Sequence, residues 1–177
     1  MAKQITVHVR LDAKSFRRYC AFDTFRRQRR WYAPVLIAML LITVSLSGLL
    51  GVVPLSESAS GVLMGLGIAV PLVVFGLYFI QIEAQVASQG LKSAPAVYSL
   101  ALGAEGVKVT NDQKKEPAVE LDWTQLWGAF RRPDAIYLYV NPQRAFILPD
   151  GQASASPDEL WRFLQKHLGP EKCVARR

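Results

Sequence analysis

The side chains best suited to acid–base or metal chemistry are scattered along this 177-residue sequence. His8 falls in an expected strand and His167 lies near the end of an expected helix, and neither has a cysteine or carboxylate cluster beside it. Metal and catalytic sites need several such groups in one place. We therefore interpret both histidines as surface or boundary residues.

Four acidic residues follow one another closely, namely Asp112, Glu116, Glu120 and Asp122. Glu120 and Asp122 alternate on an expected strand and share its face, but Lys114 and Lys115 lie near enough to balance the charge. The sequence also has no glycine-rich phosphate loop followed by a lysine, and no G-x-S-x-G motif. We expect no catalytic, cofactor-binding or metal-binding residues, and we do not expect an enzyme.

The cysteines and most of the tryptophans have structural interpretations. Cys20 and Cys173 match no metal-binding pattern, and we interpret them as free thiols in a reducing compartment. Trp123, Trp127 and Trp161 are expected in a core, because a small domain needs large side chains to fill it. The alternative is an aromatic box that holds a ligand.

Two long apolar segments organise the rest of the chain. Glu57 is the only charged residue between Arg30 and Glu83. As helices, the expected spans 34–53 and 61–82 would each be about 30 Å long, which matches the hydrocarbon thickness of a bilayer. The segment between them is too short for a domain, so the sequence predicts an antiparallel transmembrane hairpin.

Basic residues are concentrated before the first span. Residues 1–30 carry nine lysines and arginines against two acidic residues, 9 − 2 = +7, and the rest of the chain carries twelve of each. Basic segments stay on the cytoplasmic side, so we expect both termini in the cytoplasm. A folded domain without a basic excess argues against nucleic-acid binding. Four arginines are expected near anionic headgroups, or alternatively as a topology signal alone: Arg26, Arg27, Arg29 and Arg30.

Small residues cluster near the outer end of the expected hairpin, namely Ser47, Gly48 and Gly51 on one helix and Gly61, Gly65 and Gly67 on the other. The spacings Ser47-xxx-Gly51 and Gly61-xxx-Gly65 would let two helix backbones approach closely. We expect this packing inside the hairpin, and the alternative is dimerisation.

The N-terminal arm combines a strand and a helix. Residues 4–11 alternate between apolar and polar side chains, which is typical of a strand. No other strand is expected nearby in the sequence, so its partner must come from the C-terminal domain. Asp12 can cap the helix expected over residues 13–30.

The C-terminal region has the pattern of a small antiparallel β-domain. Turn residues separate six expected strands, over residues 96–102, 107–110, 118–122, 126–131, 135–140 and 145–148. Ser156 and Glu159 form a capping box that starts a helix over residues 157–168. With the N-terminal strand, this predicts an α+β membrane protein whose seven-stranded barrel, closed by one helix, is similar to a pleckstrin-homology (PH) domain.

Three short motifs carry a resemblance to a known family. The runs Asp122-Trp-Thr-Gln-Leu-Trp127, Ala135-Ile-Tyr-Leu-Tyr139 and Ala145-Phe-Ile-Leu-Pro149 resemble the C-terminal region of the YcxB-like family of bacterial membrane proteins. The resemblance covers the order of elements over nearly the whole chain. It implies a two-helix hairpin in the bacterial inner (plasma) membrane and a PH-like cytoplasmic domain, and it implies no reaction.

Four regions and two functional hypotheses follow. The regions are a basic N-terminal arm (1–30), the transmembrane hairpin (31–83), the YcxB-like domain (94–170) and a basic tail (171–177). The first hypothesis is a membrane-anchored cytoplasmic interaction or scaffold module that binds an unknown protein or itself. The alternative is an accessory subunit of a membrane enzyme or transport complex with an unrecognised site.

Overall fold

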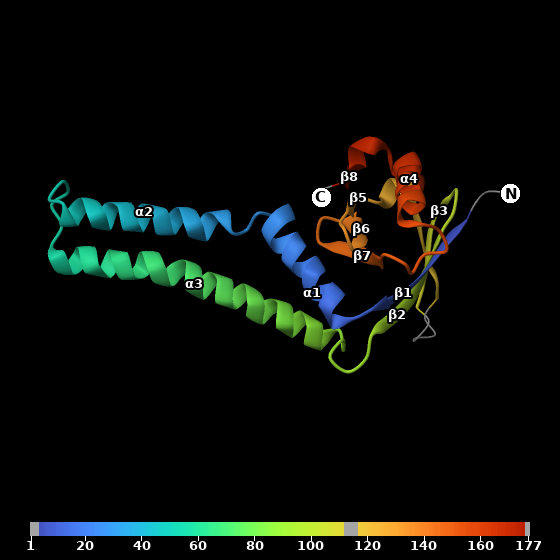
Figure 1. Cartoon of the computed structure of the whole chain (residues 1–177), viewed down its shortest axis with the longest axis horizontal. Helices are drawn as coiled ribbons and strands as arrows, with labels where there is room; N and C mark the ends of the chain where they lie inside the picture. Colours follow the sequence, from blue (N-terminus) through green and yellow to red (C-terminus); the bar gives the residue numbers. More distant parts are fainter. Residues whose placement is uncertain (1–3, 112–116, 176–177) are drawn as a thin grey trace. The chain divides into compact units, whose positions relative to one another are not determined.

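The computed structural model of the chain describes residues 4–111 and 117–175. The chain divides into two compact units, each with its own internal packing. The hairpin unit is Cys20–Gln85, and the domain unit combines Met1–Tyr19 with Val86–Arg177. Figure 1 shows the elements of both along the chain. The N-terminal arm is therefore split, because its strand belongs to the domain unit.

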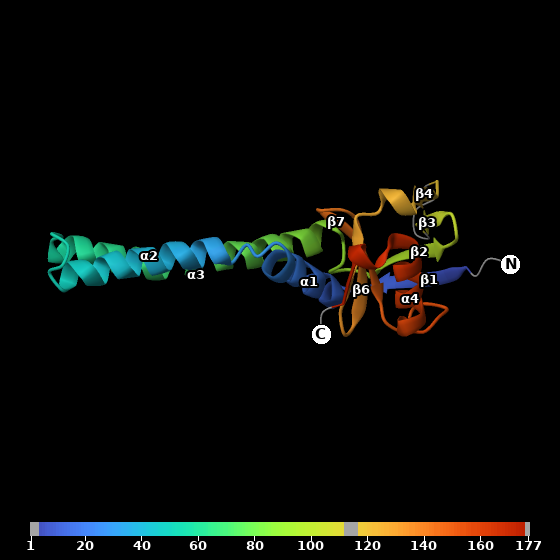
Figure 2. The same ribbon diagram turned by 90° about the horizontal axis from the view of Figure 1, so that it is seen from above.

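Two apolar helices dominate the hairpin unit, α2 (Tyr32–Leu49) and α3 (Glu57–Ser88). They lie side by side in both Figure 1 and Figure 2. Both are long and apolar enough to cross a membrane, and large apolar side chains such as Leu40 and Leu72 are exposed on them. At about 1.5 Å per residue, the 32 residues of α3 span about 48 Å, well beyond the expected segment.

The expected packing of small residues between α2 and α3 is found at Gly48 and Gly67, and it is not found at Gly51, which lies past the end of α2 with open space around its Cβ position. A Cβ on Gly67 would lie 2.7 Å from Cγ1 of Ile42, and one on Gly48 would lie 2.5 Å from Oγ of Ser60. Gly61 and Gly65 instead have open space around the Cβ position. The prediction that Gly61-xxx-Gly65 packs inside the hairpin is therefore wrong, because that pair lies on another face of α3 than Gly67. Dimerisation through it stays a prediction.

The helix before the first span changes its winding. Helix α1 (Ala13–Ala21) passes into a π-helical segment, η1 (Phe22–Arg27), where the expected helix ran to Arg30. Arg29 has φ 53°, a left-handed conformation that no regular helix continues. The juxtamembrane segment therefore ends in a turn before α2 begins.

The first sheet of the domain unit confirms the expected role of the N-terminal strand. Its order is β1-β2-β3-β4, from β1 (Ile5–Leu11), β2 (Ala96–Leu102), β3 (Gly106–Thr110) and β4 (Val119–Asp122). Strand β1 pairs antiparallel with β2 along its full length, from Ile5 opposite Leu102 to Leu11 opposite Ala96. Its apolar face is fully buried, since Ile5, Val7 and Val9 have no more than 1% exposure. The apolar residues of the alternating pattern in β1 are therefore the ones buried in the core of the domain unit, while the backbone of β1 pairs with β2.

The second sheet contains a strand that the sequence analysis missed. Its order is β7-β6-β5-β8, from β5 (Gly128–Arg131), β6 (Ala135–Asn141), β7 (Arg144–Pro149) and β8 (Cys173–Ala175). Strand β8 runs parallel to β5, with Cys173 opposite Ala129. It lies in the segment expected to be a basic tail, and its three residues are too few to show an alternating pattern.

The two sheets do not close into the expected seven-stranded barrel. After β4, Asp122 and Gln125 form a capping box around the 3-10 turn η2 (Trp123–Gln125), and this turn takes the chain out of the first sheet. On the other side, an isolated bridge pairs Val7 of β1 with Ala153, in the segment after β7, and hydrogen bonds surround it. A hydrogen bond from the Tyr98 hydroxyl to the Ile147 carbonyl (2.9 Å) links the two sheets through their interior. Within the described residues, the domain unit is therefore a pair of four-stranded sheets.

Helix α4 (Pro157–Leu168) has the bounds that the sequence predicts. The Ser156 hydroxyl accepts a hydrogen bond from the Glu159 amide (3.3 Å), and Gly169 ends the helix with φ 88°. The helix contacts β5, β8, η2 and the 3-10 turn η3 (Pro170–Lys172). Its buried face consists of Leu160, Trp161, Leu164 and Leu168. The expected apolar face thus packs on the second sheet, within the domain unit.

Candidate functional site

The histidines lie apart on two different surfaces of the domain unit. His8 is exposed on β1, with its Nδ1 3.0 Å from the Ser99 hydroxyl. His167 lies in the last turn of α4, with its Nδ1 2.9 Å from the Phe163 carbonyl oxygen, and its ring stacks on Trp123 with 4.9 Å between centroids. Both have structural partners of the kind expected for boundary histidines.

The acidic group is partly described. Asp112 and Glu116 lie outside the described residues. Glu120 forms an exposed ion pair with Lys108 on the neighbouring strand (2.9 Å), and Asp122 caps η2. Among the residues that the structure describes, no three His, Cys, Asp or Glu side chains come together as metal ligands would.

The two thiols are protected by burial. Cys20 is buried and donates a hydrogen bond to the Gln85 side chain (3.6 Å), and desolvation raises the pKa of Cys20 to about 12. Desolvation also raises the pKa of Cys173 on β8 to about 11. Because the thiolate is the reactive form, both thiols are poor nucleophiles near neutral pH.

Two of the three tryptophans expected in the core are there. Trp123 and Trp161 are buried, and the Trp123 indole donates a hydrogen bond to the Gly103 carbonyl (3.1 Å). Trp127 is 44% exposed, so its placement in the core was wrong. It stacks on Phe130 with 6.0 Å between centroids, because it lies just before β5 where the chain enters the second sheet.

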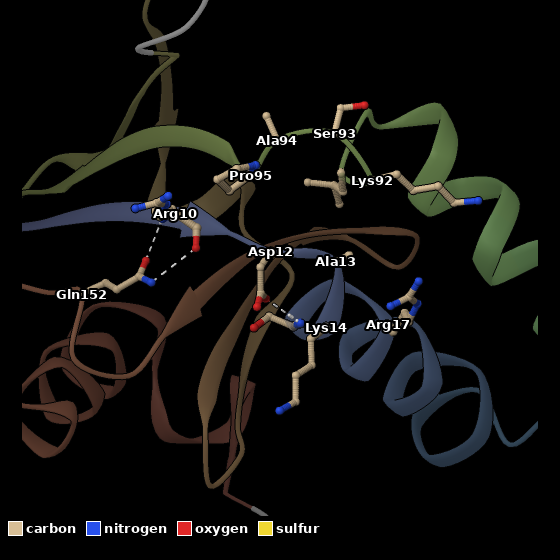
Figure 3. A pocket seen from close by; sticks show the side chains of 12 residues that line it. Arg10, Asp12, Ala13, Lys14, Arg17, Lys92, Ser93, Ala94, Pro95 and Gln152 are labelled. Carbon is tan, nitrogen blue, oxygen red and sulfur yellow. Dashed lines mark hydrogen bonds between the residues drawn. The ribbon is translucent and has the colours of Figure 1, made fainter.

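The site that stands out is an open pocket of about 660 Å³ in the domain unit. Three segments form it, namely the end of β1 with the start of α1, the turn after α3, and Gln152 after β7 (Figure 3). Four of its lining residues are basic: Arg10, Lys14, Arg17 and Lys92. We call it the basic pocket.

The walls of the basic pocket are held by backbone hydrogen bonds. The Gln152 side chain accepts from the Arg10 amide (2.7 Å) and donates to the Arg10 carbonyl (3.3 Å). In the turn after α3, the Leu91 amide donates to the Val86 carbonyl (3.1 Å), and Gly90 adopts φ 70°. Leu91 is buried, so it anchors the neighbouring Lys92 while the lysine side chain remains exposed.

The basic pocket carries a positive balance. Its charged side chains give 4 − 1 = +3, with Asp12 as the acidic member. The Asp12 carboxylate accepts the Ser15 amide (2.8 Å) at the start of α1, and hydrogen bonds from the Ser15 backbone and side chain lower the pKa of Asp12. Asp12 therefore stays ionised as a helix cap. In Figure 3, Arg10 lies at one end of the pocket and Arg17 and Lys92 at the other, with Lys14 between them.

The arginines next to the first span have two different environments. Arg26, Arg29 and Arg30 are exposed. Arg27 is only 10% exposed and donates from Nε to the Asp23 carboxylate (2.5 Å), which also accepts from the Gln28 amide group. This ion pair lies inside the hairpin unit and occupies one of the four arginines expected near headgroups.

Sequence reasoning counted the basic residues of the pocket but did not group them. Arg10, Lys14 and Arg17 were part of the basic N-terminal segment, and Lys92 lies more than seventy residues later. The pairing of β1 with β2 brings the two segments together. The expected strand pairing was therefore the signal that could have placed Lys92 beside Arg10.

Comparisons of this chain with protein-family models, with curated proteins and with solved structures found no match.

Proposed function

We propose that this chain is a membrane-anchored cytoplasmic module that works by binding rather than by catalysis. The observation that carries the proposal is the exposed apolar surface of α2 and α3, which a bilayer would cover. The order of elements, with a helical hairpin ahead of most of a mixed α+β domain, is the order that the YcxB-like resemblance implies. A PH-like relationship would fit two mainly antiparallel sheets with one helix near the C-terminus.

The charge distribution supports an orientation with both termini in the cytoplasm. Arg26, Arg29 and Arg30 are exposed before α2, whereas the loop between α2 and α3 has no lysine or arginine. Juxtamembrane arginines favour the cytoplasmic side of a bacterial inner membrane, whose surface is anionic. In this proposal the domain unit faces the cytoplasm and presents the basic pocket there.

Membrane fractionation tests the anchoring. The full chain is expected to stay in the membrane pellet after washing with alkaline carbonate and to be released only by detergent. A variant with Leu40→Arg and Leu72→Arg places charges on the exposed apolar surface and should be lost from the pellet, because each costs about 2.5–3.5 kcal/mol at a span centre. Release of the unaltered chain by carbonate alone would contradict the proposal.

A further inference from the structure

We propose that the basic pocket binds the phosphate of an anionic phospholipid headgroup. This inference rests on the proposed function, because it assigns a ligand to the cytoplasmic module. The pocket is distinct from the juxtamembrane arginines, since its lining residues belong to the domain unit and Arg26 to Arg30 belong to the hairpin unit.

Charge is the first argument for an anionic ligand. Arg10, Lys14 and Lys92 are exposed basic residues on the rim of one hollow, and the pocket as a whole has a charge of +3. The single acidic member, Asp12, is engaged in capping α1. Hydrogen bonds from ionised donors to phosphate are among the stronger polar contacts in proteins. The pocket therefore favours phosphate over neutral or cationic groups.

Rigidity of the walls is the second argument. The Arg10 backbone is fixed both by pairing with Val97 on β2 and by two hydrogen bonds with the Gln152 side chain, which accepts one and donates the other. Pro95 and the buried Leu91 restrict the opposite wall. Because the backbone of the pocket is already fixed, a ligand has to immobilise only a few flexible side chains. The loss of conformational entropy on binding is therefore small.

The position of the pocket in the chain favours a lipid over a soluble phosphate. Lys92 follows the last residue of α3, Ser88, by only four residues, which span at most about 14 Å when extended. α3 is long enough to cross a bilayer and to extend beyond it. Figure 3 shows the basic side chains spread along the pocket, an arrangement that suits an extended headgroup better than a single small ion.

Purified full-length chain in neutral detergent micelles tests the proposal. Short-chain phosphatidylglycerol is titrated in and its binding is measured, with short-chain phosphatidylcholine as the zwitterionic comparison. The pocket variant combines Arg10→Gln, Lys14→Gln and Lys92→Gln. The matched control combines Arg144→Gln, Arg162→Gln and Lys166→Gln, exposed residues of the domain unit outside the pocket that remove the same net charge.

The expected result is saturable binding of phosphatidylglycerol, and weaker binding of phosphatidylcholine, to the unaltered chain and to the control. Affinity for phosphatidylglycerol should fall at least roughly tenfold in the pocket variant, because each basic residue near an anionic surface contributes measurably. Equal affinity in the pocket variant and the control would overturn the proposal. Equally tight binding of inorganic phosphate or of an acidic peptide would overturn the assignment to lipid.

Two further measurements separate binding from folding and from anchoring. The single variant Lys92→Glu changes only an exposed turn residue and must weaken lipid binding while the thermal unfolding of the lipid-free chain is unchanged. If the Lys92→Glu chain is folded and still binds phosphatidylglycerol as tightly as the unaltered chain, the assignment of the basic pocket is contradicted. Carbonate extraction reports on anchoring alone, so a chain that binds the short-chain lipid but washes off membranes would refute the proposed function and leave the pocket assignment standing.

Discussion

Gly128 and Lys172 approach so closely that a Cβ on Gly128 would lie 2.7 Å from the Lys172 carbonyl oxygen. This contact lies where the chain after α4 returns to pair β8 with β5. Only glycine has the space for it, since no real Cβ sits this near a backbone oxygen without movement. The C-terminal strand therefore depends on a residue more than forty positions earlier.

Gly128→Ala is expected to detach β8 from β5. Release would expose Cys173 to water, lower its pKa from about 11, and raise its thiolate fraction at pH 8. The rate at which iodoacetamide modifies Cys173 should therefore increase. Gly103→Ala is the control, because its Cβ would meet the nearest atom at 3.8 Å, an ordinary contact. An unchanged rate in Gly128→Ala would show that the strand adjusts without detaching.

Trp161→Ala should cost about 3–5 kcal/mol in the free energy of unfolding, because the ring lies on the buried face of α4. Trp127→Ala removes a half-exposed ring that stacks on Phe130, and it should cost about 1 kcal/mol. Thermal or denaturant unfolding of the two variants in detergent measures the difference. Similar losses for both tryptophans would mean that α4 does not hold its apolar face against the second sheet.

Gly67→Leu should destabilise the hairpin, since a side chain there meets Ile42 on α2. Overpacking of this kind costs about 1–3 kcal/mol. Gly65→Leu meets open space and should leave the hairpin intact. Protease sensitivity of the loop between α2 and α3 in membranes compares the two variants. If Gly65→Leu were the disruptive change and also altered the oligomeric state, the result would contradict the packing of α2 on α3 at Gly67 and would support dimerisation through Gly61 and Gly65.

Most of the order of helices and strands could be predicted from local patterns in the sequence. The alternation in β1, the Ser156 cap of α4 and the charge-free spans each reflect a physical requirement that acts within a few residues. Helix α4 accordingly has its expected bounds, and β1 pairs with the C-terminal region as expected.

The missed features depend on contacts between distant residues. Strand β8 exists because Gly128 leaves space for Lys172, and two sheets form because η2 redirects the chain at Trp123. The exposure of Trp127 is likewise set by where the second sheet begins. The basic pocket was missed because the predicted pairing of the N-terminal strand named no partner strand, and Arg10 and Lys92 become neighbours through the pairing of β1 with β2.

The orientation of the anchored module is tested most directly by a reporter enzyme that is active only outside the cytoplasm. Fused after Arg177, the reporter should give no activity, because both termini are proposed to face the cytoplasm. Inserted after Pro54, in the loop between α2 and α3, the same reporter should be active. Strong activity of the fusion at Arg177 would place the domain unit on the outer side and contradict the account of a cytoplasmic module.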